Sequence, residues 1–258
     1  MKTVWVTALA KDEARVQQVM GQLKTYGLAP NGHFWIDNLE KMAWMGARDE
    51  MKNSKASLWL VLASEKELAQ PSIRYGLSLM ALSIYAANGT GFPVVFLFSG
   101  KESVAPATLP TPLRGATVLS DATPAWQAKL VAQVNKPQAP VSQDYRLDVY
   151  GDPNLGQWFE VGPAQGAWTG ALFGVAGAEI TFHAVGAKGK LPERTVLEYE
   201  QKGFELALGG KKFVAWAVKN MVDESQSYFI RVKGQPSSLL FSQYAEGQEA
   251  DVFALQLQ

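Results

Sequence analysis

The stretch Leu58-Trp59-Leu60-Val61-Leu62-Ala63-Ser64 decides the fold of the first half of the chain. A strand with one face in water alternates apolar and polar residues, whereas this run is apolar without interruption. Unbroken apolar runs of this length are typical of parallel strands that are covered on both faces. We therefore expect residues 57–63 to form a strand inside a parallel sheet with helices on both sides.

The segments around this run alternate between strand and helix patterns. Residues 12–26 and 40–53 have the apolar spacing of helices, and residues 72–87 follow Pro71, a residue favoured at helix starts. The other expected elements are strands at Val4–Ala8, His33–Ile36, Pro93–Phe98 and Ala116–Leu119, and a last helix after Pro124. This alternation predicts an α/β domain over residues 1–136, with a flavodoxin-like sheet of five parallel strands.

The pattern changes after residue 136. Two prolines in Lys136-Pro137-Gln138-Ala139-Pro140 suit neither a helix nor a central strand, so residues 137–143 are predicted to be a linker. Short β-like runs then continue to the end of the chain, and Gly209-Gly210 between two of them fits a tight hairpin turn. Residues 144–258 are therefore expected to form an all-β sandwich or barrel.

The composition narrows the classes of function. Lys plus Arg and Asp plus Glu number 24 each, and the basic residues are scattered, so nucleic acid and membrane surfaces are not expected partners. The chain has no cysteine, and His33 and His183 lack the spacing of paired ligands, so no metal site is predicted. No phosphate-binding loop, dinucleotide fingerprint or nucleophile elbow occurs. The start of the chain shows no secretory pattern, which predicts a cytoplasmic protein.

Several residues of the first half follow the order of a known domain family. They are Val4-Trp5-Val6-Thr7, Asp12, Gly27, Asp37, Trp44, Ser54, Leu62-Ala63-Ser64 and Trp126. In their order and spacing, residues 1–136 resemble the Toll/interleukin-1 receptor (TIR) domain, and no resemblance covers the C-terminal half. Taken singly, each residue also has a plain structural interpretation, because an aspartate at a helix start is usually a cap and tryptophans usually lie in the core.

The resemblance implies either assembly in signalling or hydrolysis of NAD. TIR enzymes that cleave NAD carry a glutamate in the third helix, and Gly76 occupies that position here. Glu65 and Glu67, on the preceding loop, are the candidates for a relocated carboxylate. The favoured interpretation is a signalling protein without a cofactor, in which a non-catalytic assembly or effector domain precedes a β-rich sensor or partner-binding domain. The alternatives are a NAD glycohydrolase and a nucleotide-binding module.

The resemblance also implies protein partners and self-association. TIR-like domains pair through surfaces around the loop after the second strand, here residues 28–37, where Phe34 and Trp35 are candidates for exposed interface residues. The competing interpretation is that both form the second strand and face the core. For a bound nucleotide, open α/β sheets use the carboxyl ends of their strands. The residues expected in that cleft are Ala10, Lys11, Asp37 and Trp44.

Overall fold

The computed structural model describes residues 1–136, 143–244 and 250–258, and the chain divides into two compact units, Met1–Val141 and Ser142–Gln258. Apart from Gln143, the predicted linker lies outside the described residues. The predicted fold class is confirmed, since a parallel α/β sheet is followed by antiparallel sheets. No helix in the described ranges has the length and apolar character needed to span a membrane.

The first unit is built on an all-parallel sheet with the strand order β2-β1-β3-β4-β5. Its strands are β1 (Thr3–Ala8), β2 (Ala29–Phe34), β3 (Leu58–Ala63), β4 (Val94–Phe98) and β5 (Thr117–Ser120). Its helices are α1 (Glu13–Thr25), α2 (Trp44–Asn53), α3 (Glu65–Leu68), α4 (Pro71–Asn88) and α5 (Trp126–Asn135). This strand order is that of flavodoxin-like folds, in which ligands bind at the carboxyl ends of the strands.

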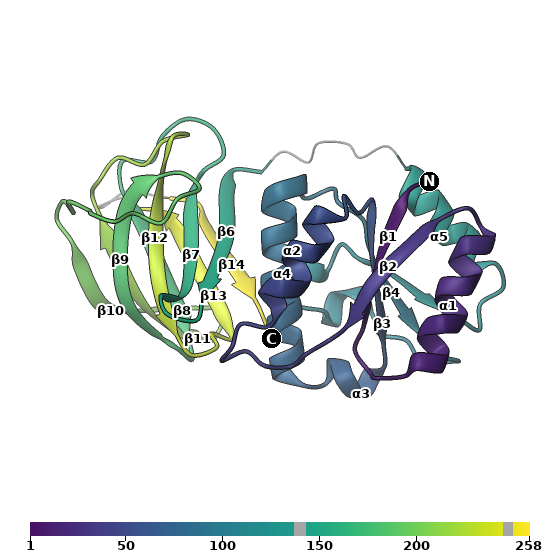
Figure 1. Ribbon diagram of the computed structural model, residues 1–258. Coiled ribbons are helices and arrows are strands. Elements are labelled where there is room, and N and C mark those ends of the chain that lie inside the picture. The colour runs from purple at the N-terminus through teal and green to yellow at the C-terminus, as the bar shows by residue number, and fades with distance from the viewer. Residues whose placement is uncertain (137–142, 245–249) are drawn as a thin grey trace. The chain divides into compact units, whose positions relative to one another are not determined.

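Helices cover both faces of this sheet, with α1 and α5 on one side and α2 and α4 on the other (Figure 1). Apolar residues of α1 and α5, such as Leu23 and Leu130, share one core with Val4, Val6 and Leu60 of the sheet. Every residue of β3 is buried, as its unbroken apolar sequence predicts. The short helix α3 was not among the expected elements, because the sequence pattern predicts a loop there.

The ends of α1 show why the helix begins and ends where it does. The Asp12 side chain accepts a hydrogen bond from the backbone N–H of Arg15 at 3.0 Å, so this aspartate caps the helix. Gly27 follows the helix with a φ of +76°, a conformation that favours glycine. The N–H of Leu28 then donates to the carbonyl of Leu23 at 3.1 Å and closes the helix end.

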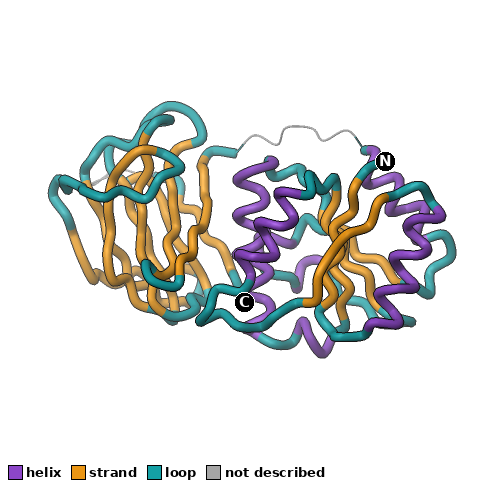
Figure 2. Tube along the Cα trace, viewed as in Figure 1, coloured by secondary structure: helices purple, strands orange, loops and turns teal. Residues whose placement is uncertain are grey.

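The second unit consists of two antiparallel sheets, and its described residues contain no helix (Figure 2). The sheets have the strand orders β10-β11-β8-β13-β14 and β6-β7-β12-β9. Their strands are β6 (Tyr145–Asp152), β7 (Gly156–Pro163), β8 (Ala171–Ala176), β9 (Glu179–Ala187), β10 (Gln201–Leu208), β11 (Lys211–Val218), β12 (Gln226–Lys233), β13 (Ser238–Gln243) and β14 (Val252–Gln256).

The two sheets pack on each other through aromatic rings. Phe159 of β7 stacks on Phe173 of β8, in the other sheet, with ring centroids 5.7 Å apart, and Phe173 stacks on Phe241 of β13, in its own sheet, at 6.1 Å. All three side chains are completely buried. This unit is therefore a sandwich with an aromatic core.

The hairpin between β10 and β11 turns through two glycines. Gly209 and Gly210 both have positive φ, 57° and 75°, and Leu208 pairs with Lys211 on either side of them. Positive φ at both central residues is the requirement of a type I′ turn. The predicted Gly209-Gly210 hairpin is confirmed.

Candidate functional site

The candidate site lies at the carboxyl end of β2, where the chain runs against α4. Trp35 extends the pairing of β2 by one residue, since its N–H donates to the carbonyl of Ala8 at 2.8 Å. Trp35 is only 9 % exposed. Asp37 accepts a hydrogen bond from the hydroxyl of Ser72, in the first turn of α4, at 2.6 Å. This bond fixes the loop after β2 to the start of α4.

Gly76 of α4 makes room for the Trp35 indole. A Cβ atom at position 76 would lie 2.6 Å from Cζ2 of Trp35 and 3.3 Å from Cδ2 of Leu39. The absence of a side chain at Gly76 therefore permits this close packing. Gly76 and Ser72 are one helical turn apart, so the ring contact and the Asp37 hydrogen bond lie on one face of α4.

The expectation of two exposed aromatic residues in this loop is wrong. Phe34 is the last residue of β2 and packs, partly buried, against the core shared with α1 and α5. Trp35 is buried on the other face, because successive residues of a strand point to opposite faces and both faces are covered here. The exposed apolar side chain is Ile36, which is 66 % exposed. No sequence signal marked Ile36, because strand alternation places it on the same face as the partly buried Phe34.

Two buried N–H groups at this place have no hydrogen-bond acceptor among the described residues. The indole N–H of Trp5 donates to Nδ1 of His33 at 3.1 Å, so a neutral His33 ring carries its proton on Nε2. That Nε2 and the Nε1 of Trp35 are both buried and unpaired in the described chain. Burial lowers the pKa of His33 from 6.5 to about 4, so the ring is neutral at pH 7.

The two candidate carboxylates, Glu65 and Glu67, lie in α3 rather than in a loop, and both have hydrogen-bond partners. Glu67 forms a capping box, since Oε2 accepts from the N–H of Ser64 at 2.8 Å and from its hydroxyl at 2.5 Å. Glu65 accepts a long hydrogen bond of 3.4 Å from the N–H of Ser103. These contacts hold the end of α3 and the neighbouring loop.

The four predicted cleft residues lie in three separate segments and differ in exposure. Ala10 and Lys11 are exposed between β1 and α1. Trp44 is buried at the start of α2, with the Arg48 guanidinium 5.3 Å from its ring centroid. Of the four residues, Asp37 is the one that lies beside the contact between Trp35 and α4.

An open hollow of about 380 Å³ lies at the opposite edge of the sheet, near the amino ends of β1, β3 and β4. Its lining residues are Lys2, Ala56, Ser57, Asn88, Phe92, Val134, Asn135 and Lys136. Flavodoxin-like folds bind ligands at the carboxyl ends instead, and none of the predicted site residues lines this hollow.

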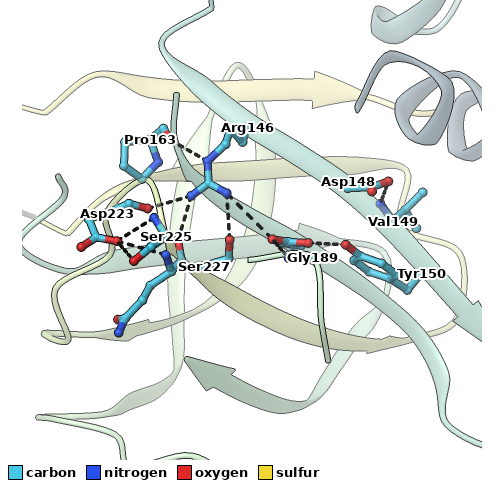
Figure 3. A network of polar contacts seen from close by, with 11 residues as sticks. Arg146, Asp148, Val149, Tyr150, Pro163, Gly189, Asp223, Ser225 and Ser227 are labelled. Carbon is cyan, nitrogen blue, oxygen red and sulfur yellow. Dashed lines mark hydrogen bonds and ion pairs between the residues drawn. The ribbon is translucent and has the colours of Figure 1, made fainter. Parts of the chain in front are cut away.

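A polar network covers part of one face of the sheet β6-β7-β12-β9 in the second unit (Figure 3). Its centre is Arg146, whose three nitrogens all have partners. The partners are the carbonyls of Pro163 (2.7 Å), Asp223 (2.8 Å) and Gln226 (2.7 Å), the hydroxyl of Ser227 (3.1 Å) and the carboxylate of Glu160 (3.9 Å). Glu160 also accepts from the N–H of Gly189 at 2.9 Å and from the Tyr150 hydroxyl. Since every nitrogen of the guanidinium has a partner within the chain, the network holds the sheet together.

His183 of β9 forms a second polar cluster, with Tyr228 and Glu200. Burial raises the pKa of Tyr228, so its hydroxyl stays protonated and donates to Nδ1 of His183 over 2.7 Å. Nε2 then donates to Glu200 at 3.0 Å, and Lys202 binds the same carboxylate oxygen at 2.8 Å. Burial lowers the pKa of His183, and the hydrogen bond to Glu200 opposes this shift. Over the described ranges, no group of three or more His, Asp or Glu side chains is placed to hold a metal ion.

The fold thus defines a flavodoxin-like α/β domain followed by a β-sandwich. No protein-family model matches this chain, and no curated protein matches it either. The resemblance to TIR domains therefore depends on the order of residues in the first unit.

Proposed function

We propose that this protein acts in cytoplasmic signalling, with a TIR-like first unit that assembles with protein partners and does not cleave NAD. The second unit binds a further partner. The observation that carries the proposal is the contact between Trp35 and Gly76. In TIR enzymes that cleave NAD, the resemblance places a glutamate at the position of Gly76, and here an indole ring lies against that position.

The chemistry of NAD cleavage explains why the contact between Trp35 and Gly76 argues against a hydrolase. Breaking the bond between nicotinamide and ribose develops positive charge on the ribose, and a nearby carboxylate stabilises that charge. An indole ring carries no negative charge to replace the carboxylate. The contacts of Glu65 and Glu67 serve the ends of α3, so neither supports the alternative of a relocated acid.

The first prediction is that the purified full chain releases nicotinamide from NAD no faster than buffer does. The measurement is a time course of nicotinamide release over a range of NAD concentrations. Variants Glu65→Gln and Glu67→Gln are the matched controls. Saturable release that either variant abolishes would sink the proposal and establish the hydrolase alternative.

Ile36 is the residue through which we propose that the first unit associates. It follows a buried residue and precedes Asp37, whose bond to Ser72 fixes the loop to α4. A side chain on a fixed loop loses little conformational freedom on binding, which favours affinity. Burying this exposed apolar side chain against a partner is favourable, because it removes apolar surface from water.

The second prediction is that Ile36→Ser weakens self-association and leaves the melting temperature unchanged. Truncating an anchor typically costs about 2 kcal/mol, or roughly 30-fold in the dissociation constant. Sedimentation velocity over a concentration series measures this change. Tyr26→Ser is the matched control, because Tyr26 is also exposed, at 46 %, and lies at the far end of α1. A wild-type protein that stays monomeric, or equal weakening in both variants, would contradict the role of Ile36.

A further inference from the structure

The sheet face that holds Arg146 carries a second arginine, Arg231 of β12. Arg231 belongs to a row of four residues that runs across the strands of this sheet. Tyr150 of β6 pairs with Trp158 of β7, Trp158 pairs with Arg231, and Arg231 pairs with Phe182 of β9. Residues that oppose each other in antiparallel strands share a face. They therefore form one continuous row across the sheet, with Arg231 between two aromatic rings.

The guanidinium of Arg231 is held in place from three sides. Its central carbon lies 5.8 Å from the ring centroid of Trp158 and 5.8 Å from that of Phe182. Its Nε donates to the hydroxyl of Thr181 at 2.9 Å. Thr181 sits at a register shift of β9, where Arg231 pairs with Phe182 and Val232 pairs with Ile180. Such β-bulges re-aim side chains and are frequent beside binding sites.

The outer end of this guanidinium has no partner within the described part of the chain. Nη1 and Nη2 make no hydrogen bond there, and no carboxylate pairs with them. Neither nitrogen is among the buried unpaired atoms, so both reach solvent. Arg146 on the same face is the opposite case, because each of its three nitrogens has a hydrogen-bond partner within the network. Arg231 thus presents two parallel N–H donors that are already oriented.

Exposed apolar side chains flank these donors. Phe182 is 45 % exposed and Leu155, in the turn between β6 and β7, is 53 % exposed. This turn is ordered, since Asp152 accepts from the N–H of Leu155 at 3.0 Å and the Trp158 indole donates to the Leu155 carbonyl at 2.9 Å. A Cβ at Gly156 would lie 3.7 Å from Cδ of Arg231, so the turn adjoins the arginine stem. We call Leu155, Trp158, Phe182 and Arg231 the Arg231 patch.

We propose that the Arg231 patch binds a protein segment in which an aspartate or glutamate is flanked by apolar side chains. The carboxylate accepts both outer N–H groups of Arg231, in the bidentate geometry that a planar guanidinium favours. The apolar neighbours pack on Phe182 and Leu155. Charge complementarity selects this occupant, because the fixed positive charge has no carboxylate partner in the described chain. Tryptophan and arginine are also enriched among residues that dominate binding energy.

This inference rests on the partner-binding role proposed for the second unit and names the chemistry of the partner. Its test measures the binding of a peptide to the second unit. The Ile36 test reads self-association through the first unit. Either proposal can therefore fail while the other stands.

The experiment selects a random dodecamer peptide library on the full chain, and the enriched sequences are synthesised. We expect an acidic residue between apolar residues, and an affinity that falls by at least about 10-fold in Arg231→Gln, as loss of charge-assisted hydrogen bonds predicts. Arg231→Lys keeps the charge but loses the planar fork, so its affinity should lie below that of the wild type. Lys233→Gln, which removes an exposed charge from the same strand, should bind like the wild type.

Thermal melts of all three variants separate binding from folding, because a variant that melts like the wild type has kept the sandwich. No enrichment, a consensus without an acidic residue, or binding that Arg231→Gln leaves unchanged would overturn the proposal. An equal loss of peptide affinity in Lys233→Gln would show that binding depends on nonspecific charge attraction, and it would overturn the proposal as well. Inorganic phosphate that displaces the peptide at an equal concentration would reassign the site to phosphate.

Discussion

The two units satisfy their buried polar groups to different extents. In the second unit, every nitrogen of Arg146 has an acceptor, and Glu160 accepts from two further groups. At the end of β2 in the first unit, Nε2 of His33 and Nε1 of Trp35 are buried without an acceptor among the described residues. The side chains of both regions are largely buried, but of these two regions only the Arg146 network has a hydrogen-bond partner for each buried nitrogen.

This difference separates residues that are needed for their polar atoms from residues that are needed for their shape. A buried donor or acceptor that loses its partner costs about 1–3 kcal/mol. Removing Arg146 exposes several acceptors to that penalty at once. Removing the indole nitrogen of Trp35 costs no hydrogen bond within the described chain, because none is made there.

The largest effect is expected from Trp35→Ala, which empties the space against Gly76. Truncating a buried tryptophan typically lowers the free energy of unfolding by about 3–5 kcal/mol. Trp35→Phe keeps most of the ring and removes an unpaired N–H, so its effect should stay below about 1 kcal/mol. Urea unfolding measures both values. A small loss in Trp35→Ala would restore the hypothesis of an exposed interface residue, and equal losses in both variants would show that the nitrogen has a partner.

The next effect is expected from Arg146→Met, which keeps the length of the stem and removes the guanidinium. Breaking a buried ion pair by removing one partner costs about 3 kcal/mol or more, since the remaining groups stay buried and unpaired. Arg231→Met on the same sheet face is the control and should cost less, about 1–2 kcal/mol, because it loses one hydrogen bond and two cation–π contacts but no ion pair. Equal losses in the two variants would remove the distinction between the arginines.

A smaller effect is expected from pH through His33. Its pKa is about 4 in the folded chain and 6.5 ordinarily, so the unfolded chain binds the proton first as the pH falls. The stabilisation is complete above pH 6.5 and is lost between pH 6.5 and pH 4, by at most about 3 kcal/mol. Denaturant unfolding of wild type and His33→Gln at pH 7 and pH 4.5 measures the difference between the two proteins.

His33→Gln is a suitable comparison because the glutamine oxygen still accepts from the Trp5 indole. His183 remains in both proteins, and its lowered pKa acts in the same direction, so its contribution cancels in the comparison. The variant should therefore lose less stability on acidification than the wild type. Parallel pH curves for the two proteins would show that His33 is not the group responsible.

The elements of both units were largely predictable from local patterns. The apolar run at residues 57–63 predicted the central strand β3, and Gly209-Gly210 predicted the hairpin between β10 and β11. Asp12 and Gly27 marked the two ends of α1. Each of these signals acts within a few residues of chain, where side-chain period and backbone preference decide the conformation.

The candidate site was less predictable. The sequence allowed Phe34 and Trp35 either to be exposed at an interface or to face the core, and the contact with Gly76, 41 positions away, accounts for the burial of Trp35. Glu65 and Glu67 were candidates in the sequence, but Glu67 caps α3 through Ser64 and Glu65 accepts from Ser103, 38 residues further along the chain. No sequence pattern predicted a role for Arg231, because a single arginine in a strand belongs to no motif.

By itself, the sequence determined which segments form strands and helices, and hence an α/β unit followed by a β unit, because these depend on the period of apolar side chains. Tertiary structure alone decided that the guanidinium of Arg146 bonds within the sandwich and that the outer nitrogens of Arg231 face solvent. The partner Ser227 is 81 residues from Arg146, and Phe182 reaches Arg231 only through the register of two strands. Such pairings depend on which strands lie side by side, and the register between strands is set by packing of the whole sandwich rather than by neighbouring residues.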